Sequence, residues 1–306
     1  MELLQLQYFR TVARKEHMTR AAEELRIAQP ALSKTISRLE EDLGVPLFDR
    51  EGRQIRLNAF GKAFLRKVET ALTALEEGRK EVREMSGLDQ GSIHLATSTL
   101  DLLTEPLAEF VSAHPKVSFR ITQASAGEME ELLASGEVDI CFTPLPLEGP
   151  GFKSAQVLNE DVFLAVPPGH RLAGRESVAL AEVANDPFIG YKEGMLFQPM
   201  NDAFMRKAGI SPKFVCRVDE PSAISRLVQA GLGVALVGGC GRVAGTPLTL
   251  LPISAPACGR SFQVVWHEKR YLSVAVQQFR DFIVQYFGKR RNSGAKTEGK
   301  KAELAG

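Results

Sequence analysis

The sequence predicts a multidomain chain of α and α/β class, with a small helical part and hairpin followed by a larger α/β part. Three observations carry this prediction. Residues 1–58 combine short helical patterns with a basic, turn-containing segment, residues 59–87 form one long helical pattern, and residues 88–288 alternate strand-like runs with helices. A chain of 306 residues with 44% hydrophobic residues can bury two or three separate cores.

Composition narrows the setting in which the protein works. The sequence has no run of about 18 apolar residues, and its beginning, MELLQLQYFR, lacks the basic-then-apolar order of a secretory signal. We therefore expect a cytoplasmic protein with no membrane partner. The net charge of +1 argues against binding nucleic acid over the whole surface, so any DNA contact must come from a local basic surface.

The residues that usually make metal, disulfide or catalytic sites are scattered. The four cysteines, which have no CxxC pair, are Cys141, Cys216, Cys240 and Cys258. We expect reduced, buried thiols and no metal site, and a redox-active pair stays open as the alternative. The sequence also lacks GxSxG, HExxH and GxxxxGK[ST], so we predict a protein that is not an enzyme and needs no cofactor.

The first two helices follow from apolar spacing. Leu6, Phe9 and Val12 recur at helical intervals. A short second helix follows, for which Thr19 is the expected N-cap and Leu25 lies on the inner face.

A third helix is predicted over residues 29–43. Its apolar residues step by four, three and four, which places them on one stripe and the polar residues off it. The stripe consists of Leu32, Ile36, Leu39 and Leu43. Pro30 is tolerated because it lies in the first turn, and Gly44 ends the helix.

A basic hairpin follows the third helix. The segment PLFDREGRQIRL predicts two short strands about a turn near Glu51 and Gly52, and it carries Arg50, Arg53 and Arg56. Three helices followed by a basic hairpin make a winged helix-turn-helix.

Residues 59–87 predict one long helix with Asn58 as its N-cap. Its apolar residues form a partly heptad-like stripe of Phe60, Phe64, Val68, Ala71, Leu75 and Val82. Such a stripe on an isolated helix needs a partner. Residues 87–91 would then form a hinge.

From residue 88, strands and helices alternate at the short spacing typical of βαβ units around a parallel sheet. A first set comprises a strand in GSIHLATS, helices over 102–112 and 128–134, a strand at 117–122 and the strand VDICFTP. A second set, from about 163 to 266, has strands at 163–166, 188–191, 214–218, 234–237 and 262–266. An amphipathic helix over 273–287 closes the fold, and the polar, basic residues 289–306 predict a disordered tail.

The polar face of the helix over 29–43 allows two interpretations. It is either an ordinary solvated face or a surface that reads DNA. Gln29, Ser33 and Lys34 lie near the helix start, and these side-chain types reach base edges. Amino-terminal N–H groups can meet phosphate, and the hairpin arginines can contact a neighbouring groove or backbone. The residues favour DNA binding without excluding the solvated face.

The order of these residues resembles a known family. The stretch LQYFRTVARKEHMTRAAEELRIAQPALSKTISRLEEDLGVPLFDREGRQIRLNAFGKAFL resembles the amino-terminal domain of LysR-type transcriptional regulators, with AAxxL, AQPALSxxIxxLE and LGxxLFxR in order. The segments AHPKVSFRI, LASGEVDICF and LVQAGLGVALV extend the resemblance over nearly the whole chain. DREGRQIRLNAFGKAFL and GMLFQPMNDAFMRKAGI look most like the subgroup of the glutamate synthase operon regulator.

The resemblance implies a homo-oligomer, a dimer of dimers, that binds double-stranded DNA and a small-molecule effector. It implies a DNA-binding domain over 1–58, a dimerising linker helix over 59–87 and a regulatory domain over 88–288 made of two periplasmic-binding-protein-like subdomains. Subdomain I would comprise about 88–162 and 267–288, and subdomain II about 163–266. The implied DNA contacts are Gln29, Pro30, Ser33, Lys34, Arg38, Arg50 and Arg53.

The resemblance also implies an effector site in the cleft between the subdomains, where helix amino termini and hydroxyls meet an anionic ligand. The matching positions are Thr97, Ser98, Thr99, Gly127, Thr143, Leu196 and Phe197. A hydroxyl cluster in a strand-end loop is often only a helix cap, so this alternative stays open. The stretch between the first strand and Pro115 is shorter than the family pattern, so we expect that side of the pocket to differ from the family in shape.

Two rival functions come from other classes. An oxidoreductase would use the glycines Gly239, Gly241 and Gly245, but Thr246-Pro247 interrupts the helix that a phosphate-binding loop needs. A ligand receptor with a non-functional DNA-binding-like part is the second rival. We predict instead a sequence-specific DNA-binding transcriptional regulator whose activity is modulated by a small, anionic metabolite.

Overall fold

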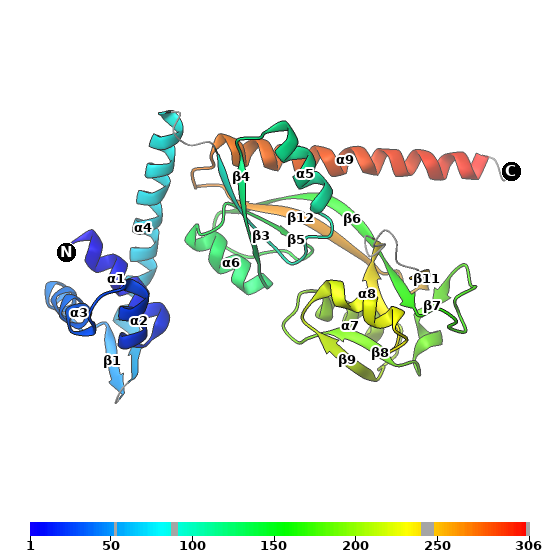
Figure 1. Cartoon of the computed structure of the whole chain (residues 1–306), viewed down its shortest axis with the longest axis horizontal. Coiled ribbons are helices and arrows are strands. Elements are labelled where there is room, and N and C mark those ends of the chain that lie inside the picture. The colour runs from blue at the N-terminus through cyan, green and yellow to red at the C-terminus, as the bar shows by residue number, and fades with distance from the viewer. Residues whose placement is uncertain (52–53, 87–90, 240–247, 304–306) are drawn as a thin grey trace. The chain divides into compact units, whose positions relative to one another are not determined.

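The computed structural model of the chain describes residues 1–51, 54–86, 91–239 and 248–303. Two compact units divide the chain, Met1–Asp89 and Gln90–Gly306. Figure 1 shows the first as a group of helices with a hairpin and the second as a long mixed sheet flanked by helices.

The first unit is a winged helix-turn-helix followed by a long helix, as the sequence predicts. Its three short helices are α1 (Leu3–Lys15), α2 (Met18–Leu25) and α3 (Gln29–Leu43). The antiparallel hairpin of β1 (Phe48–Glu51) and β2 (Gln54–Leu57) follows, then α4 (Ala59–Met85). One buried cluster joins these elements and includes Phe9, Val12, Ala21, Leu32, Ile36, Leu39, Leu47 and Val68.

The cap of α2 differs from the prediction. His17, not Thr19, is the N-cap, and its Nδ1 accepts a hydrogen bond from the backbone N–H of Arg20 at 3.4 Å. An imidazole nitrogen at this position satisfies the same first-turn N–H that a hydroxyl would, so the helix begins before Thr19.

The other two predicted boundaries are confirmed. Gly44 ends α3 in the left-handed conformation, with φ of 72°. Asn58 caps α4, because its Oδ1 accepts a hydrogen bond from the N–H of Gly61 at 2.8 Å. A side chain at Gly61 would collide with the carbonyl oxygen of Leu47, so only glycine lets α4 approach the hairpin this closely.

The first half of the second unit is a βαβ arrangement. Its elements are β3 (Ser92–Thr97), α5 (Thr104–Ala113), β4 (Ser118–Gln123), α6 (Ala126–Ser135) and β5 (Ile140–Thr143). β4, β3 and β5 are adjacent and parallel, as predicted.

Two long antiparallel strands, β6 (Phe152–Val166) and β12 (Gly259–His267), then connect the two halves of the unit. The predicted strands at 163–166 and 262–266 are only parts of them, and the latter part pairs with β5 of the first half. The sheet is therefore mixed, not parallel throughout. The early part of β6, whose residues are exposed or half-buried from Phe152 to Gln156, has too weak an apolar pattern to reveal a strand.

The second half of the unit is built around the far end of β6. β10 (Ala235–Gly238) and β11 (Thr249–Ala255) pair with β6, and β7 (Val178–Ala179) pairs with β11. The remaining elements are η1 (Leu180–Val183), the parallel pair β8 (Phe188–Tyr191) and β9 (Phe214–Val218), and the helices α7 (Phe197–Lys207) and α8 (Pro221–Gln229). β11 has no counterpart among the predicted strands.

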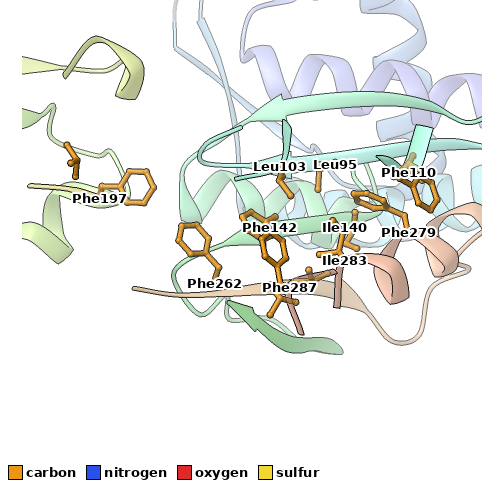
Figure 2. Close-up of a cluster of buried hydrophobic side chains, with 14 of the residues drawn as sticks. Leu95, Leu103, Phe110, Ile140, Phe142, Phe197, Phe262, Phe279, Ile283 and Phe287 are labelled. Carbon is orange, nitrogen blue, oxygen red and sulfur yellow. The ribbon is translucent and has the colours of Figure 1, made fainter. Parts of the chain in front are cut away.

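The last helix, α9 (Val274–Glu303), packs against the first half of the unit. Figure 2 shows Phe279, Ile283 and Phe287 of α9 beside Phe110 and Phe142, in one buried cluster. The helix extends to Glu303, past the predicted end at residue 287, and the disordered tail over 289–306 stays a prediction.

Candidate DNA-binding helix and effector site

α3 presents its polar start to solvent while its apolar stripe is buried. Leu32 and Leu39 are 0% exposed and Ile36 is 3% exposed. Gln29, Pro30, Lys34 and Arg38 are exposed, and Ser33 is half-buried. Leu43, predicted to belong to the stripe, is only partly buried at its end. The buried stripe therefore fixes the helix so that the predicted base readers face outward.

The beginning of α3 has no side-chain cap, although Pro30 carries no N–H and the N–H of Ala31 donates to the carbonyl oxygen of Ala28 at 3.0 Å. The N-cap residue, Ala28, has no side chain that could accept a hydrogen bond from the first turn. The exposed amino-terminal end of a helix attracts phosphate oxygens through the positive end of the helix dipole, and here the N–H of Gln29 can add a donor. Among the described residues, no ion pair neutralises Lys34 or Arg38.

The hairpin is positioned by a carboxylate from α3. Oε1 of Glu40 accepts a hydrogen bond from the N–H of Leu47 at 2.7 Å, which holds the segment between α3 and β1. Arg50 lies in β1, opposite Ile55. Arg53 and the predicted turn at Gly52 lie outside the described residues.

The predicted effector hydroxyls meet at one edge of the sheet. Thr97 is the last residue of β3 and pairs with Gln123 at the end of β4 and with Phe142 near the end of β5. Because these strands are parallel, their carboxyl ends and the residues that follow lie together. Thr97, Ser98, Thr99 and Thr143 are all less than 7% exposed.

Most of these hydroxyls already have local partners. Oγ1 of Thr97 donates to the carbonyl oxygen of Thr99 at 2.8 Å, and Oγ1 of Thr143 donates to that of Leu145 at 3.2 Å. Oγ1 of Thr99 accepts from the N–H of Asp101 at 3.3 Å. These threonines stabilise the loops after their strands. Ser98 differs, since its Oγ is buried and has no hydrogen-bond partner among the described residues. A buried hydroxyl without a partner is costly and calls for a ligand or a water molecule.

Gly127 differs from these buried hydroxyl residues, because it is exposed in the first turn of α6. Ser125 caps that helix, and the carboxylate of Glu128 accepts from the N–H of Ser125 at 2.8 Å and from its hydroxyl at 2.7 Å. Hydrogen bonds from the backbone and the hydroxyl of Ser125 lower the pKa of Glu128. The first turn of α6 is thus occupied by its own capping box.

The two predicted contacts from the second half face different clusters. Leu196 is packed in a cluster with residues of the first half, among them Ala124 and Met129. The ring of Phe197 lies 5.4 Å from that of Tyr191 and 4.3 Å from the guanidinium carbon of Arg260. The start of α7 therefore contacts the first half as well as the connecting strands.

The sequence analysis missed the buried polar residues around α7. Glu160 and Arg260 face each other on β6 and β12, and Asn201 and Gln198 lie on α7, all less than 8% exposed. Arg260 donates to Oδ1 of Asn201 at 3.0 Å. The available signal was an arginine in a strand that otherwise becomes apolar, RSFQVVW.

Neither a metal cluster nor a disulfide is present among the described residues. Cys141, Cys216 and Cys258 are free thiols, and Cys240 lies outside the described residues together with Gly241 and Gly245 of the glycine-rich stretch. Burial raises the pKa of Cys141 to about 12. A hollow of about 400 Å³ lies beside Cys258, between β6, β11 and the start of β12, and none of the predicted effector contacts lines it.

Two family models cover these two units in order. A model described as a bacterial regulatory helix-turn-helix protein of the lysR family matches residues 3–62, and one described as the LysR substrate binding domain matches residues 86–288. The chain belongs to the LysR family of transcriptional regulators. This confirms the resemblance found in the sequence. DNA binding and an effector-binding domain are properties of the family.

Curated relatives of the LysR family match over nearly the whole chain. The uncharacterized regulator YybE of Bacillus subtilis is 35% identical over 94% of this chain and 99% of its own length. The transcriptional dual regulator GltC of the same organism is 32% identical, over 94% of this chain and 98% of its own length. These relatives are transcriptional regulators, not enzymes, which supports the predicted class.

Solved LysR-family structures share the fold. CbnR, 23% identical, covers 93% of this chain and 99% of its own length with a TM-score of 0.67. CbnR has also been solved in complex with its target DNA, with the same TM-score. A full-length OxyR variant of Pseudomonas aeruginosa is 21% identical, with a TM-score of 0.68 and coverage of 92% and 94%. Among the described residues, no helix is both long and apolar enough to cross a membrane.

Proposed function

We propose that this LysR-family regulator binds specific DNA sequences through α3 and changes its DNA binding when a small anionic metabolite binds between the two halves of the second unit. The single observation that carries the proposal is α3 itself. Its buried stripe of Leu32, Ile36 and Leu39 holds an uncapped, exposed start that carries Gln29 and Lys34.

In this proposal Gln29, Ser33 and Lys34 read bases, because their side chains carry the donors and acceptors that match base edges in the major groove. Pro30 and Arg38 would border the contact on α3, and Arg50 and Arg53 would contact the backbone or a neighbouring groove from the hairpin. The relative with target DNA, CbnR, is a precedent for a protein of this fold binding DNA.

The effector would lie where Ser98, Thr99 and Thr143 end the parallel strands and Leu196 and Phe197 begin α7. Ser98 supports this location most directly, through its buried hydroxyl without a partner among the described residues. Thr97 and Gly127 would shape the neighbouring loops. A ligand that contacts both halves can favour one arrangement of them, because only differential binding shifts such an equilibrium.

Assembly into a dimer of dimers would place two pairs of DNA-binding units on one operator. α4 supports pairing through its exposed apolar residues, since Phe60, Leu75 and Val82 are more than half exposed. An apolar face of this kind on a long helix is stabilised by burial against a second copy. A regulator with this role would act in the cytoplasm, on chromosomal DNA.

The test measures binding of the full-length chain to DNA fragments that the chain itself selects from a random-sequence pool. Lys34→Ala should weaken binding by about 1–3 kcal/mol, because the lost cation contacts a base edge or a phosphate. If the contact is to phosphate, the salt dependence should also fall by about one unit of slope.

Lys213→Ala is the matched control, since Lys213 is an exposed lysine next to β9 of the second unit. Fluorescence anisotropy over a salt series should give equal binding for this variant and the unmodified chain. If no sequence is enriched from the pool, or if Lys34→Ala binds as well as the control, α3 is not the reading helix.

A further inference from the structure

The strongest unexplained group in the second unit is Arg260 on β12. Its guanidinium is buried, with the side chain 3% exposed. A buried cation is stable only when opposite charge and hydrogen bonds replace its water. The contacts of Arg260 therefore show whether its guanidinium has all its partners within the protein or has a donor left for a ligand.

These contacts leave part of the guanidinium unmatched. One Nη donates to Oδ1 of Asn201 at 3.0 Å, and the other lies 3.9 Å from Oε2 of Glu160, beyond hydrogen-bond distance. Phe197 lies against the guanidinium, 4.3 Å from ring centroid to guanidinium carbon. Nε is buried and has no acceptor among the described residues. The open Nε–H of a charged, buried guanidinium can donate a strong hydrogen bond to a carboxylate oxygen.

Glu160 acts as the counter-charge of the resting site. It faces Arg260 across the strand pair, and a side chain at Gly238 would collide with its carboxylate. The separation of 3.9 Å makes this a loose pair instead of a bidentate one. A ligand carboxylate that hydrogen-bonds to the guanidinium directly can therefore compete with Glu160, because a shorter, charge-assisted hydrogen bond is stronger.

The location suits recognition that is coupled to movement. Arg260 and Glu160 lie on the two strands that connect the halves, and Phe197 and Asn201 lie one turn apart on α7. Leu196, directly before α7, packs against the first half. A group bound at Arg260 thus touches the elements on which the relative position of the halves depends.

We propose that Arg260 is the residue that recognises the acidic group of the effector, and that the effector is a small carboxylic acid bound through its carboxylate. This rests on the proposed effector-binding function and adds to it the ligand class and the residue that selects it. The carboxylate takes the open Nε–H of Arg260, and Phe197 covers the guanidinium face.

The test uses the full-length chain and a panel of short aliphatic and aromatic mono- and dicarboxylates, each with its primary amide, together with inorganic phosphate. Thermal unfolding identifies binders, and calorimetry measures their affinity. We expect at least one carboxylate to raise Tm while its amide does not, because only the anion offers two charged acceptors. Binding of phosphate or of amides without binding of any carboxylate contradicts the proposal, and so does a panel without any binder.

The decisive variant is the double substitution Arg260→Gln with Glu160→Gln, which removes both charges of the pair together. Its affinity for the carboxylate should fall roughly 10- to 100-fold, the loss of one or two charge-assisted hydrogen bonds. Lys207→Gln, which removes an exposed cation at the end of α7, should keep full affinity.

Separate outcomes distinguish this proposal from the proposed function. A carboxylate that loses affinity in Ser98→Ala but not in the double variant confirms an effector site and contradicts the role of Arg260. If the carboxylate binds but changes no DNA binding, the regulatory function fails while the recognition by Arg260 stands. Thermal unfolding of the double variant without ligand serves as the check on the fold of the second unit.

Discussion

For buried polar residues of this chain, hydrogen-bond partners distinguish a structural role from a binding role. Thr97 and Thr143 are buried, but their hydroxyls donate to backbone carbonyls within their own loops. Ser98 Oγ and Arg260 Nε are buried without partners among the described residues. An unmatched buried donor costs about 1–3 kcal/mol. A ligand that bonds to Ser98 or Arg260 would remove this cost, which Thr97 and Thr143 do not have.

Burial also determines the chemistry of the thiols. Cys141 is 0% exposed, and its pKa is raised to about 12 because desolvation disfavours the thiolate. At pH 8, iodoacetamide should therefore alkylate Cys141 far more slowly in the native protein than in the same protein in denaturant. Mass spectrometry after iodoacetamide treatment measures this difference. Equal labelling of Cys141 in the two states would contradict its burial.

At the scale of one element, α3 shows how a core stripe directs a surface. Leu39→Ala should destabilise the first unit by about 2–5 kcal/mol, since it removes a fully buried side chain. Leu43→Ala, at the partly buried end of the same stripe, is the matched control and should cost clearly less. Chemical denaturation of the full-length chain, monitored by a probe placed within residues 1–86, measures the loss of stability in both variants. Equal losses of stability in the two variants would contradict the difference in burial between Leu39 and Leu43.

The cap of α6 gives a pH-dependent prediction. Ser125→Ala should destabilise the second unit by about 1 kcal/mol, because it removes the N-cap hydroxyl. The pKa of Glu128 is lowered by its hydrogen bonds to Ser125, so its stabilising contribution is present above the ordinary value of 4.5 and is lost as pH falls through its lower folded pKa. Part of the difference between the variant and the unmodified chain should therefore disappear in acid. Thermal unfolding across about pH 3 to 7, in the range of carboxylate titration, checks this; a difference that grows toward acid would have the wrong sign.

At the scale of the whole molecule, two connections organise the chain. β6 and β12 join the halves of the second unit, since β12 also pairs with β5 of the first half and β6 with β10 of the second half. Arg260 and Glu160 lie on these two connecting strands. α4 follows the winged helix with an apolar face that its own unit does not cover, because Leu75 is 52% and Val82 66% exposed.

That uncovered face predicts the assembly. Leu75→Glu together with Val82→Glu should dissociate the dimer that we propose for α4, because two carboxylates would be buried in the apolar contact. Thr70→Glu is the control, since Thr70 is exposed on α4 but lies off the apolar stripe. Light scattering gives the mass of each variant. An unchanged mass for the double variant would place the oligomer contact elsewhere.

The sequence by itself determined those features that depend on local pattern. The stripe of α3, the caps at Gly44 and Asn58, the hairpin, and the parallel order of β3, β4 and β5 all follow from spacing and from the residue types at helix ends. The order of motifs determined the family. These signals lie within a few turns or one hairpin, so the amino-acid sequence contains them directly.

Only the tertiary structure decided which polar groups lack partners and which strands connect the two halves. Arg260 and Glu160 are 100 residues apart in the sequence and become neighbours through the antiparallel pairing of β6 and β12. Ser98 and Thr97 both carry a hydroxyl, so the sequence does not distinguish their roles. The difference is a hydrogen bond that exists only in the folded loop. Long-range pairing and buried hydrogen bonds depend on the whole chain, and no local pattern records them.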